Sequence, residues 1–233
     1  MRVAEPLVVV AGMMCDARLW APQIARFSAG RAVHVAPITG ADRVDALAAS
    51  LLADAPPRFA LAGLSMGGIV AMAVMAQAPE RVTRIALLDT NPKAERAEVA
   101  AARGPQMDKV RAGLLRSVMR DEMKPNYLAP GPGQGAVLDL VLDMAMSLGP
   151  EVFLRQSRAL MTRPDQQDVL RQVCVPALIL CGEHDTLCPL HRHELMADLI
   201  PDARLEVVKD AGHMPTLEQP DAVNAAFERW LNA

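Results

Sequence analysis

The chain has 233 residues, of which 52% are hydrophobic and 22% charged, and its formal net charge is −3. Such a chain can form one globular domain, or one domain with an insertion, around its own apolar core. Because both charge signs are interspersed, the sequence has no basic stripe to neutralise phosphates, which argues against nucleic acid as a partner. The N-terminal apolar run is too short for a signal segment or a membrane span, so we expect a cytoplasmic protein, monomeric or homodimeric, without a membrane partner.

Apolar runs and helical patterns alternate along the chain. Six short runs are rich in Val, Ile, Leu and Ala and lack polar alternation, which is typical of parallel strands covered on both faces. They lie at residues 7–10, 32–38, 58–64, 85–89, 177–181 and 205–208. The helical patterns lie at residues 16–29, 42–55, 66–78, 190–199 and 220–230. This order predicts an α/β fold with a doubly wound, mainly parallel sheet of about six strands.

Three side chains mark the expected starts of helices. Asp16 and Asp42 are expected N-caps, because a short carboxylate accepts hydrogen bonds from the free N–H groups of a first turn. Pro220 suits a first turn, where a missing N–H costs nothing. We therefore expect these helices to begin close to the three residues.

The alternation of strands and helices stops between residues 92 and 165. This stretch has amphipathic helical patterns joined by Gly and Pro, and it has no convincing strand pattern. We predict a helical lid, or cap, at residues 92–165, inserted into a core formed by residues 1–91 and 166–233. Six lid methionines would provide an adaptable apolar surface or ordinary helix packing. They are Met107, Met119, Met123, Met144, Met146 and Met161. Four arginines would bind an acidic substrate or form a solvated face. They are Arg111, Arg116, Arg120 and Arg155.

The strongest chemical motif is Gly63-Leu64-Ser65-Met66-Gly67. It follows the strand pattern FALAGL and opens the helix pattern GGIVAMAVMAQA, which is the setting of a nucleophile elbow. A serine on such a strained turn is pushed clear of the sheet, and the flanking glycines let the strand and the helix come close. Ser65 is therefore the candidate nucleophile. The alternative is a glycine-rich turn without chemistry.

The candidate general base is His213, which follows the strand pattern LEVV. Gly212 permits the sharp turn that would bring the ring over the edge of the sheet. Among the other histidines, His34 lies inside a strand pattern, and His191 and His193 lie in the first turn of a helix. The last two suggest a metal site, but positions i and i+2 do not share a helix face and no third ligand has suitable spacing. No metal is expected.

The candidate acid is Asp185, in the loop that follows the strand pattern ALILC. Glu183 lies two residues nearer the strand and is one alternative, and Asp89, at the end of the pattern IALLD, is another. The chain order Ser, Asp, His favours Asp185, because each member then follows a predicted strand. In this triad His213 would remove the proton of Ser65, while Asp185 would hold the imidazole tautomer.

Two backbone N–H groups are expected to stabilise the oxyanion that forms during acyl transfer. The N–H of Met66 lies at the start of the helix after the nucleophile. A second N–H should come from the loop after the first strand, where Met13 is the expected donor and Met14 the alternative. Expected substrate contacts are Met14, Cys15 and Met214, although Cys15 could equally be a small buried hydrophobe. The four cysteines contain no CxxC pair and are expected to be free thiols.

Several segments resemble those of the α/β-hydrolase superfamily, in particular small lid-bearing bacterial serine esterases. They are AGMMCDARLWAPQ, APERVTRIALLDT, PALILCGEHDTLCP and AGHMPTLEQP. The resemblance implies the α/β-hydrolase fold and no cofactor. The first hairpin of larger members is expected to be missing, and Ala11 stands where many members have His before the glycine of the oxyanion loop.

The resemblance implies a serine hydrolase that cleaves a small or medium carboxylic ester through an acyl-enzyme intermediate. A serine nucleophile argues against haloalkane dehalogenase and dienelactone hydrolase chemistry. Because a fold does not fix a reaction, a carbon-carbon bond hydrolase, a lactonase or a thioesterase with the same triad is an alternative. A non-catalytic ligand-binding protein is a further alternative.

Overall fold

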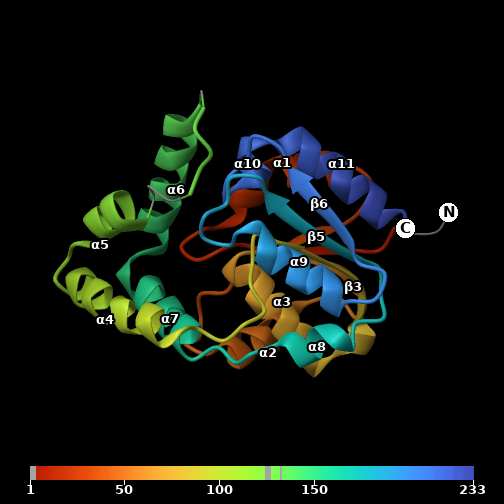
Figure 1. Cartoon of the computed structure of the whole chain (residues 1–233), viewed down its shortest axis with the longest axis horizontal. Coiled ribbons are helices and arrows are strands. Elements are labelled where there is room, and N and C mark those ends of the chain that lie inside the picture. Colours follow the sequence, from red (N-terminus) through yellow and green to blue (C-terminus); the bar gives the residue numbers. More distant parts are fainter. Residues whose placement is uncertain (1–3, 124–126, 132) are drawn as a thin grey trace.

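Among the described residues, 4–123, 127–131 and 133–233, six strands form one all-parallel sheet at the centre of the molecule (Figure 1). The structure is a computed structural model. Its strands are β1 (Leu7–Val10), β2 (Val33–Ala36), β3 (Phe59–Leu64), β4 (Val82–Leu88), β5 (Ala177–Gly182) and β6 (Arg204–Val208). Their number and direction confirm the prediction of a parallel α/β sheet.

The strand order is β2-β1-β3-β4-β5-β6. Because β1 lies between β2 and β3, the chain first builds the sheet on one side of β1 and then continues on the other side. Such a reversal is a topological switch point, and ligands of open α/β sheets bind there, outside the carboxyl ends of the strands. The loops after β1, β3, β5 and β6 all lie at this edge. They carry the Gly12–Met14 loop, Ser65, Asp185 and His213.

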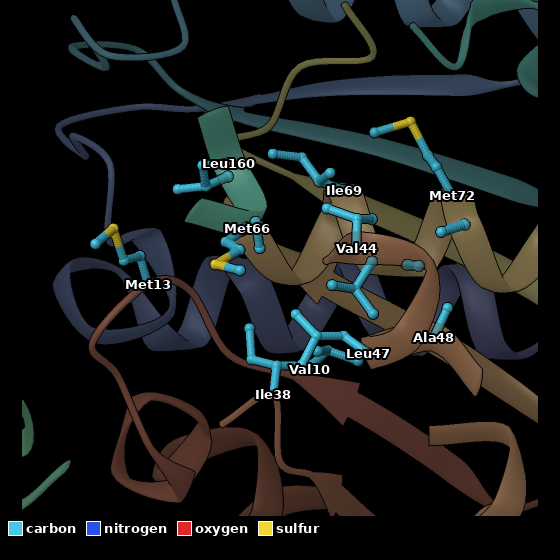
Figure 2. Packing of buried hydrophobic residues seen from close by; sticks show 14 of the residues in the cluster. Val10, Met13, Ile38, Val44, Leu47, Ala48, Met66, Ile69, Met72 and Leu160 are labelled. Carbon is cyan, nitrogen blue, oxygen red and sulfur yellow. The ribbon is translucent and has the colours of Figure 1, made fainter. Parts of the chain in front are cut away.

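Helices cover both faces of the sheet. On one face, α2 (Val44–Asp54), α3 (Met66–Gln77) and α9 (Leu190–Leu199) contribute to a large apolar cluster, part of which Figure 2 shows. On the other face, α1 (Ala21–Phe27) and α11 (Pro220–Leu231) contribute to a second cluster. Successive residues of β1 belong alternately to the two clusters, as the pleat of a strand requires. The central strands are therefore buried on both faces, which explains their unbroken apolar sequences.

The predicted helix at residues 16–29 divides into two helices. A short 3-10 helix, η1 (Ala17–Trp20), precedes α1, and Pro22 lies in the first turn of α1. The expected N-cap at Asp16 is confirmed, since its carboxylate accepts a 3.0 Å hydrogen bond from the Arg18 N–H.

The expected N-cap at Asp42 is wrong. The chain is still extended at Arg43 (φ −137°, ψ 140°), and α2 begins at Val44, so Asp42 lies outside the first turn. Its carboxylate instead forms an ion pair of 3.6 Å with Arg158.

The expectation that every strand is covered on both faces is also wrong for β6. This edge strand has a single neighbour, and its Val207 is 46% exposed.

Between β4 and β5 the chain forms a group of helices that stands beside the sheet, at the left of Figure 1. It consists of α4 (Ala97–Arg111), α5 (Leu115–Ser117), the π-helix η3 (Val118–Met123), α6 (Gln134–Leu148) and α7 (Pro150–Met161). The remaining short helices are η2 (Pro79–Arg81), α8 (Gln167–Arg171) and α10 (Pro215–Glu218). The division into a core and a lid at residues 92–165 stays a prediction. Within the described ranges, each helix is too short or too polar to cross a membrane.

Candidate active site

Ser65 occupies a sharp turn between β3 and α3. Its backbone has φ 54° and ψ −118°. Residues other than glycine rarely adopt this conformation, which is typical of strained functional turns. A Cβ on Gly63 would lie 2.3 Å from the Gly67 carbonyl oxygen, and one on Gly67 would lie 2.2 Å from the Val10 carbonyl oxygen. The two glycines therefore allow the helix to approach both β3 and β1 closely. This arrangement matches the predicted elbow.

His213 lies in the loop after β6, and its ring faces Ser65. The Nε2 atom of His213 is 2.9 Å from Oγ of Ser65. Glu218 holds this loop from both sides, because its carboxylate accepts 3.0 Å hydrogen bonds from the N–H groups of Gly212 and Met214. This role of Glu218 was not predicted from the sequence. A residue five positions after a histidine carries no signal of its own until the loop geometry is known.

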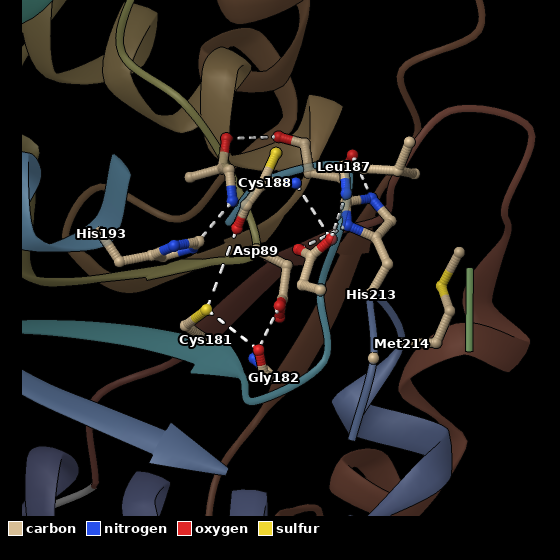
Figure 3. A network of polar contacts seen from close by, with 12 residues as sticks. Asp89, Cys181, Gly182, Leu187, Cys188, His193, His213 and Met214 are labelled. Atoms are coloured by element: carbon tan, nitrogen blue, oxygen red, sulfur yellow. Dashed lines mark hydrogen bonds and ion pairs between the residues drawn. The ribbon is translucent and has the colours of Figure 1, made fainter. Parts of the chain in front are cut away.

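Asp185 lies behind His213 on the side away from Ser65. Its Oδ2 atom is 2.8 Å from Nδ1 of His213, and its Oδ1 atom accepts hydrogen bonds of 2.8 Å and 2.9 Å from the N–H groups of Leu187 and Cys188 (Figure 3). Burial alone would raise the pKa of Asp185, but the charge of His213 and the hydrogen bonds lower it to about 2. Asp185 is therefore a carboxylate that accepts from a His213 Nδ1–H.

The two alternative acids occupy different places. Glu183 is exposed and accepts a 3.2 Å hydrogen bond from the Asp210 N–H, whereas the carboxylate bonded to His213 is that of Asp185. Asp89 is fully buried behind Asp185, and its Oδ1 accepts a 2.9 Å hydrogen bond from the Gly182 N–H. Burial and the nearby charge of Asp185 raise the pKa of Asp89 well above its ordinary value. Asp89 therefore holds its proton more tightly than Asp185 does.

Among the other histidines, His191 lines the same cavity as Ser65, whereas His34 and His193 do not. His193 is buried, its Nε2 accepts a 3.3 Å hydrogen bond from the Thr90 N–H, and burial lowers its pKa to about 4. Ligand atoms of His193, Asp89 and Cys181 lie within 4.8 Å of one another. However, burial raises the pKa of the Cys181 thiol, and a thiolate is what a metal requires. His193, Asp89 and Cys181 are therefore buried residues of the core that form hydrogen bonds with the backbone. His34 lies in β2.

The loop after β1 passes directly beside Ser65. A Cβ on Gly12 would lie 3.4 Å from the Ser65 Cβ, which is an ordinary van der Waals contact. The N–H of Met14 donates a 2.9 Å hydrogen bond to Oε1 of Gln156, so this N–H already has an acceptor within the protein. The N–H of Met13 precedes it in the same loop, and the N–H of Met66 is the first of α3, where helix geometry provides no partner within the helix.

A cavity of about 870 Å³ opens over Ser65 and His213. Met13, Met66 and Met214 contribute to its lining. The expected substrate contacts Met14 and Cys15 do not contribute to it. Both are buried, and burial raises the pKa of the Cys15 thiol to about 12. The expectation that these two side chains face a substrate in this cavity has no support from their positions.

Residues from the 92–165 segment line one side of the cavity, but most of them are not those expected. Of the six methionines, only Met123 reaches the cavity, while Met107, Met119 and Met144 are buried in helix packing and Met146 and Met161 are partly exposed. None of the four expected arginines reaches it. Arg111, Arg120 and Arg155 instead pair with Asp108, Asp121 and the Thr39 carbonyl. The cationic lining comes from Lys93, Arg96, Arg103, Arg163 and Arg192.

Comparison with known proteins agrees with this fold. Residues 7–226 match the family described as the alpha/beta hydrolase family, so the chain belongs to the α/β-hydrolase family of enzymes. A pimeloyl-acyl-carrier-protein methyl ester esterase of Aromatoleum aromaticum is 26% identical, with 92% of this chain and 93% of the relative covered. An uncharacterised carboxylesterase of Bacillus subtilis is 27% identical, with 99% of this chain and 80% of the relative covered. A solved structure of a thermophilic esterase from Thermogutta terrifontis with malate bound has a TM-score of 0.90 and 28% identity. The match covers 98% of this chain and 89% of that chain.

Proposed function

We propose that the protein hydrolyses small or medium carboxylic esters, with Ser65 as nucleophile, His213 as base and Asp185 as the acid that orients the base. The observation that carries the proposal is the continuous hydrogen-bonded chain from Ser65 Oγ through His213 to Asp185, which opens onto a cavity. The names of the related esterases from Aromatoleum, Bacillus and Thermogutta support ester hydrolysis as the reaction.

In the first half of the reaction, Ser65 Oγ attacks the acyl carbon and His213 Nε2 takes its proton. The negative oxygen of the tetrahedral intermediate accepts hydrogen bonds from the backbone N–H groups of Met66 and Met13, which are the proposed oxyanion donors. Collapse of the intermediate breaks the bond to the alcohol, which leaves with the proton from His213. The acyl group stays bound to Ser65.

In the second half, His213 removes a proton from water, and the resulting hydroxide attacks the acyl carbon of the Ser65 ester. The acid product leaves, and the proton returns to Ser65 Oγ. Asp185 acts in both halves by accepting the Nδ1–H of His213, which fixes the tautomer and stabilises the imidazolium. Met13 and Met214 are the proposed apolar contacts for the substrate, since both line the cavity beside the reacting atoms.

The proposal is tested by measuring turnover of p-nitrophenyl esters of increasing acyl length with the wild type and with Ser65→Ala. We expect turnover by the wild type with a clear preference in chain length, because the cavity has a fixed volume, and no turnover above background by Ser65→Ala. Equal turnover by the two proteins would contradict the role of Ser65. Absence of turnover by the wild type, together with normal labelling of Ser65 by a fluorophosphonate, would contradict ester hydrolysis and point to other chemistry with the same triad.

A further inference from the structure

Two arginines and one glutamate form a compact cluster in the wall of the cavity. Glu95 precedes α4, Arg103 lies within α4 and Arg163 follows α7. Nη2 of Arg103 is 2.8 Å from Oε2 of Glu95, and Nη2 of Arg163 is 3.1 Å from Oε1 of the same carboxylate. The guanidinium groups thus share a single carboxylate.

The cluster is largely withdrawn from water. The exposed fractions of the side chains are 15% for Arg103, 9% for Arg163 and 5% for Glu95. Two positive charges and one negative charge leave one positive charge without a counterion inside the cluster. Burial, together with the nearby positive charges of Arg103 and Arg192, lowers the pKa of Arg163. A buried charge without a partner is costly, so this arrangement favours the binding of an anion.

The cluster belongs to the same cavity as the catalytic residues. All three residues line the cavity that contains Ser65 and His213. Nη1 of Arg103 is 3.9 Å from Sδ of Met13, in the loop beside Ser65, and it has no oxygen acceptor among the described residues. Arg192 also lines the cavity and forms no ion pair within the part of the chain that the structure describes. The wall is therefore cationic, although the whole chain carries a net charge of −3.

We propose that Arg103 and Arg163 bind a carboxylate carried by the substrate, so that the enzyme prefers esters that also have a free carboxylate, such as half-esters of dicarboxylic acids. This inference rests on the proposed ester hydrolysis and specifies its substrate class. The planar fork of a guanidinium matches a carboxylate. Nε and Nη2 of Arg103 both donate to Oε2 of Glu95, which leaves Nη1 of Arg103 for a second anion. The single surplus charge of the cluster matches a monoanion better than a phosphate dianion.

The test compares two substrates that differ only in a remote charge, namely the mono-p-nitrophenyl ester of adipate and its methyl-capped neutral counterpart. The readout is the ratio of kcat/KM for the anionic substrate to that for the neutral one, in which changes in the chemical step cancel. We expect a ratio of roughly tenfold or more for the wild type, because a hydrogen bond between charged groups is stronger than one between neutral groups. The ratio should fall as KCl is added.

Variants of the cluster should change this ratio in opposite directions. Arg103→Met and Arg163→Met should each lower it about tenfold, mainly through KM, whereas Glu95→Gln should raise it because a competing carboxylate is removed. Arg103→Lys should retain part of the preference if Arg103→Met proves unstable. The matched control is Arg111→Gln, on the same helix but paired with Asp108 outside the cavity, and it should leave the ratio unchanged.

Three results would overturn the inference. The first is a wild-type ratio of one or less with good turnover of the neutral ester, and in that case ester hydrolysis itself would stand. The second is an unchanged ratio in folded Arg103→Met and Arg163→Met. The third is stronger competitive inhibition by inorganic phosphate than by free adipate. If the wild type hydrolysed neither ester and did not react with a fluorophosphonate, the proposed function itself would fail.

Discussion

The backbone N–H of Met14 donates a hydrogen bond of 2.9 Å to Oε1 of Gln156, a fully buried side chain of α7. The Nε2 group of Gln156 donates in turn to the Ile38 carbonyl oxygen at 3.0 Å. One amide therefore ties the loop after β1 to the loop after β2. Met14 itself has a positive φ of 56°, so this contact stabilises a loop conformation that the backbone alone does not favour. The loop also carries Met13, the proposed oxyanion donor.

Replacement of this amide should therefore affect both stability and rate. Gln156→Met keeps the length of the side chain but leaves the Met14 N–H and the Ile38 carbonyl without their partner. We expect a loss of about 1–3 kcal/mol in the free energy of unfolding and a lower kcat, measured by urea denaturation and ester turnover. Gln167→Met is the control, because Gln167 pairs with Asp165 at the surface. Wild-type values for Gln156→Met would show that the contact does not hold the loop.

The assignment of the acid is tested by a pair of isosteric variants. Asp185→Asn cannot accept the Nδ1–H of His213 in the same way, so kcat should fall by roughly 10²- to 10⁴-fold. Glu183→Gln should retain most of the activity, since its side chain contacts the Asp210 N–H at the surface. A reversal of the two effects in steady-state kinetics would assign the acid role to Glu183.

The buried carboxyl group of Asp89 should make stability depend on pH in a defined direction. Its pKa in the folded protein is raised, so the folded state keeps a proton that the unfolded chain releases above its ordinary value of 3.8. The contribution of Asp89 to stability is therefore fully present at lower pH and is lost as the pH rises. Asp89→Asn cannot titrate and keeps an acceptor for the Gly182 N–H, so its stability relative to the wild type should increase from pH 4.5 to pH 8.

Urea denaturation across this pH range measures the effect, with the exposed Asp198→Asn as a control for the loss of one negative charge. A relative stability of Asp89→Asn that decreases as the pH rises would mean that Asp89 is charged in the folded state.

The contribution of Asp185 to stability should depend on pH in the opposite direction, and at lower pH. Its pKa is lowered to about 2, so its contribution to stability is present above 3.8 and is lost as the pH falls toward 2.

The elbow should not tolerate a methyl group at Gly67. An added Cβ would lie 2.2 Å and 2.7 Å from the carbonyl oxygens of Val10 and Ala11, which belong to the backbone and cannot move without distorting β1 and its loop. Gly67→Ala should therefore lower the free energy of unfolding by about 3 kcal/mol or more. Gly104→Ala should instead raise it by about 0.5–1 kcal/mol, because the site lies in α4 and has no neighbour within 4 Å. Similar denaturation midpoints for the two variants would contradict this account of the elbow.

Local sequence patterns predicted most of the fold, because each central strand is a continuous apolar run and the crossovers other than the long one between β4 and β5 each contain a short helical stretch. The same reasoning placed Ser65, Asp185 and His213 after three strands, and parallel strands bring such positions to one edge. It failed at Asp42, where a suitable capping side chain lies one residue before the extended N-cap position of Arg43. The capping preference of a residue type does not by itself determine where the first turn of a helix begins.

The cationic wall could not be predicted from the sequence in the same way. Glu95 and Arg163 are separated by 68 positions, and Arg103 looks like any charged residue of a surface helix. Only the folding of α4 and α7 against each other brings them together beside the cavity. The role of Gln156 was missed for a similar reason, since a buried glutamine in an amphipathic helix has no sequence signal that separates it from an exposed one.

The central claim is that Ser65 is a nucleophile activated by His213. Reaction with a fluorophosphonate, followed by intact-mass measurement and peptide mapping, tests it most directly with the wild type, Ser65→Ala and His213→Gln. We expect a single adduct on Ser65 in the wild type, none in Ser65→Ala, and labelling of His213→Gln that is slower by roughly 10²-fold or more. An adduct on another residue, or wild-type protein that stays unlabelled while correctly folded, would contradict the claim.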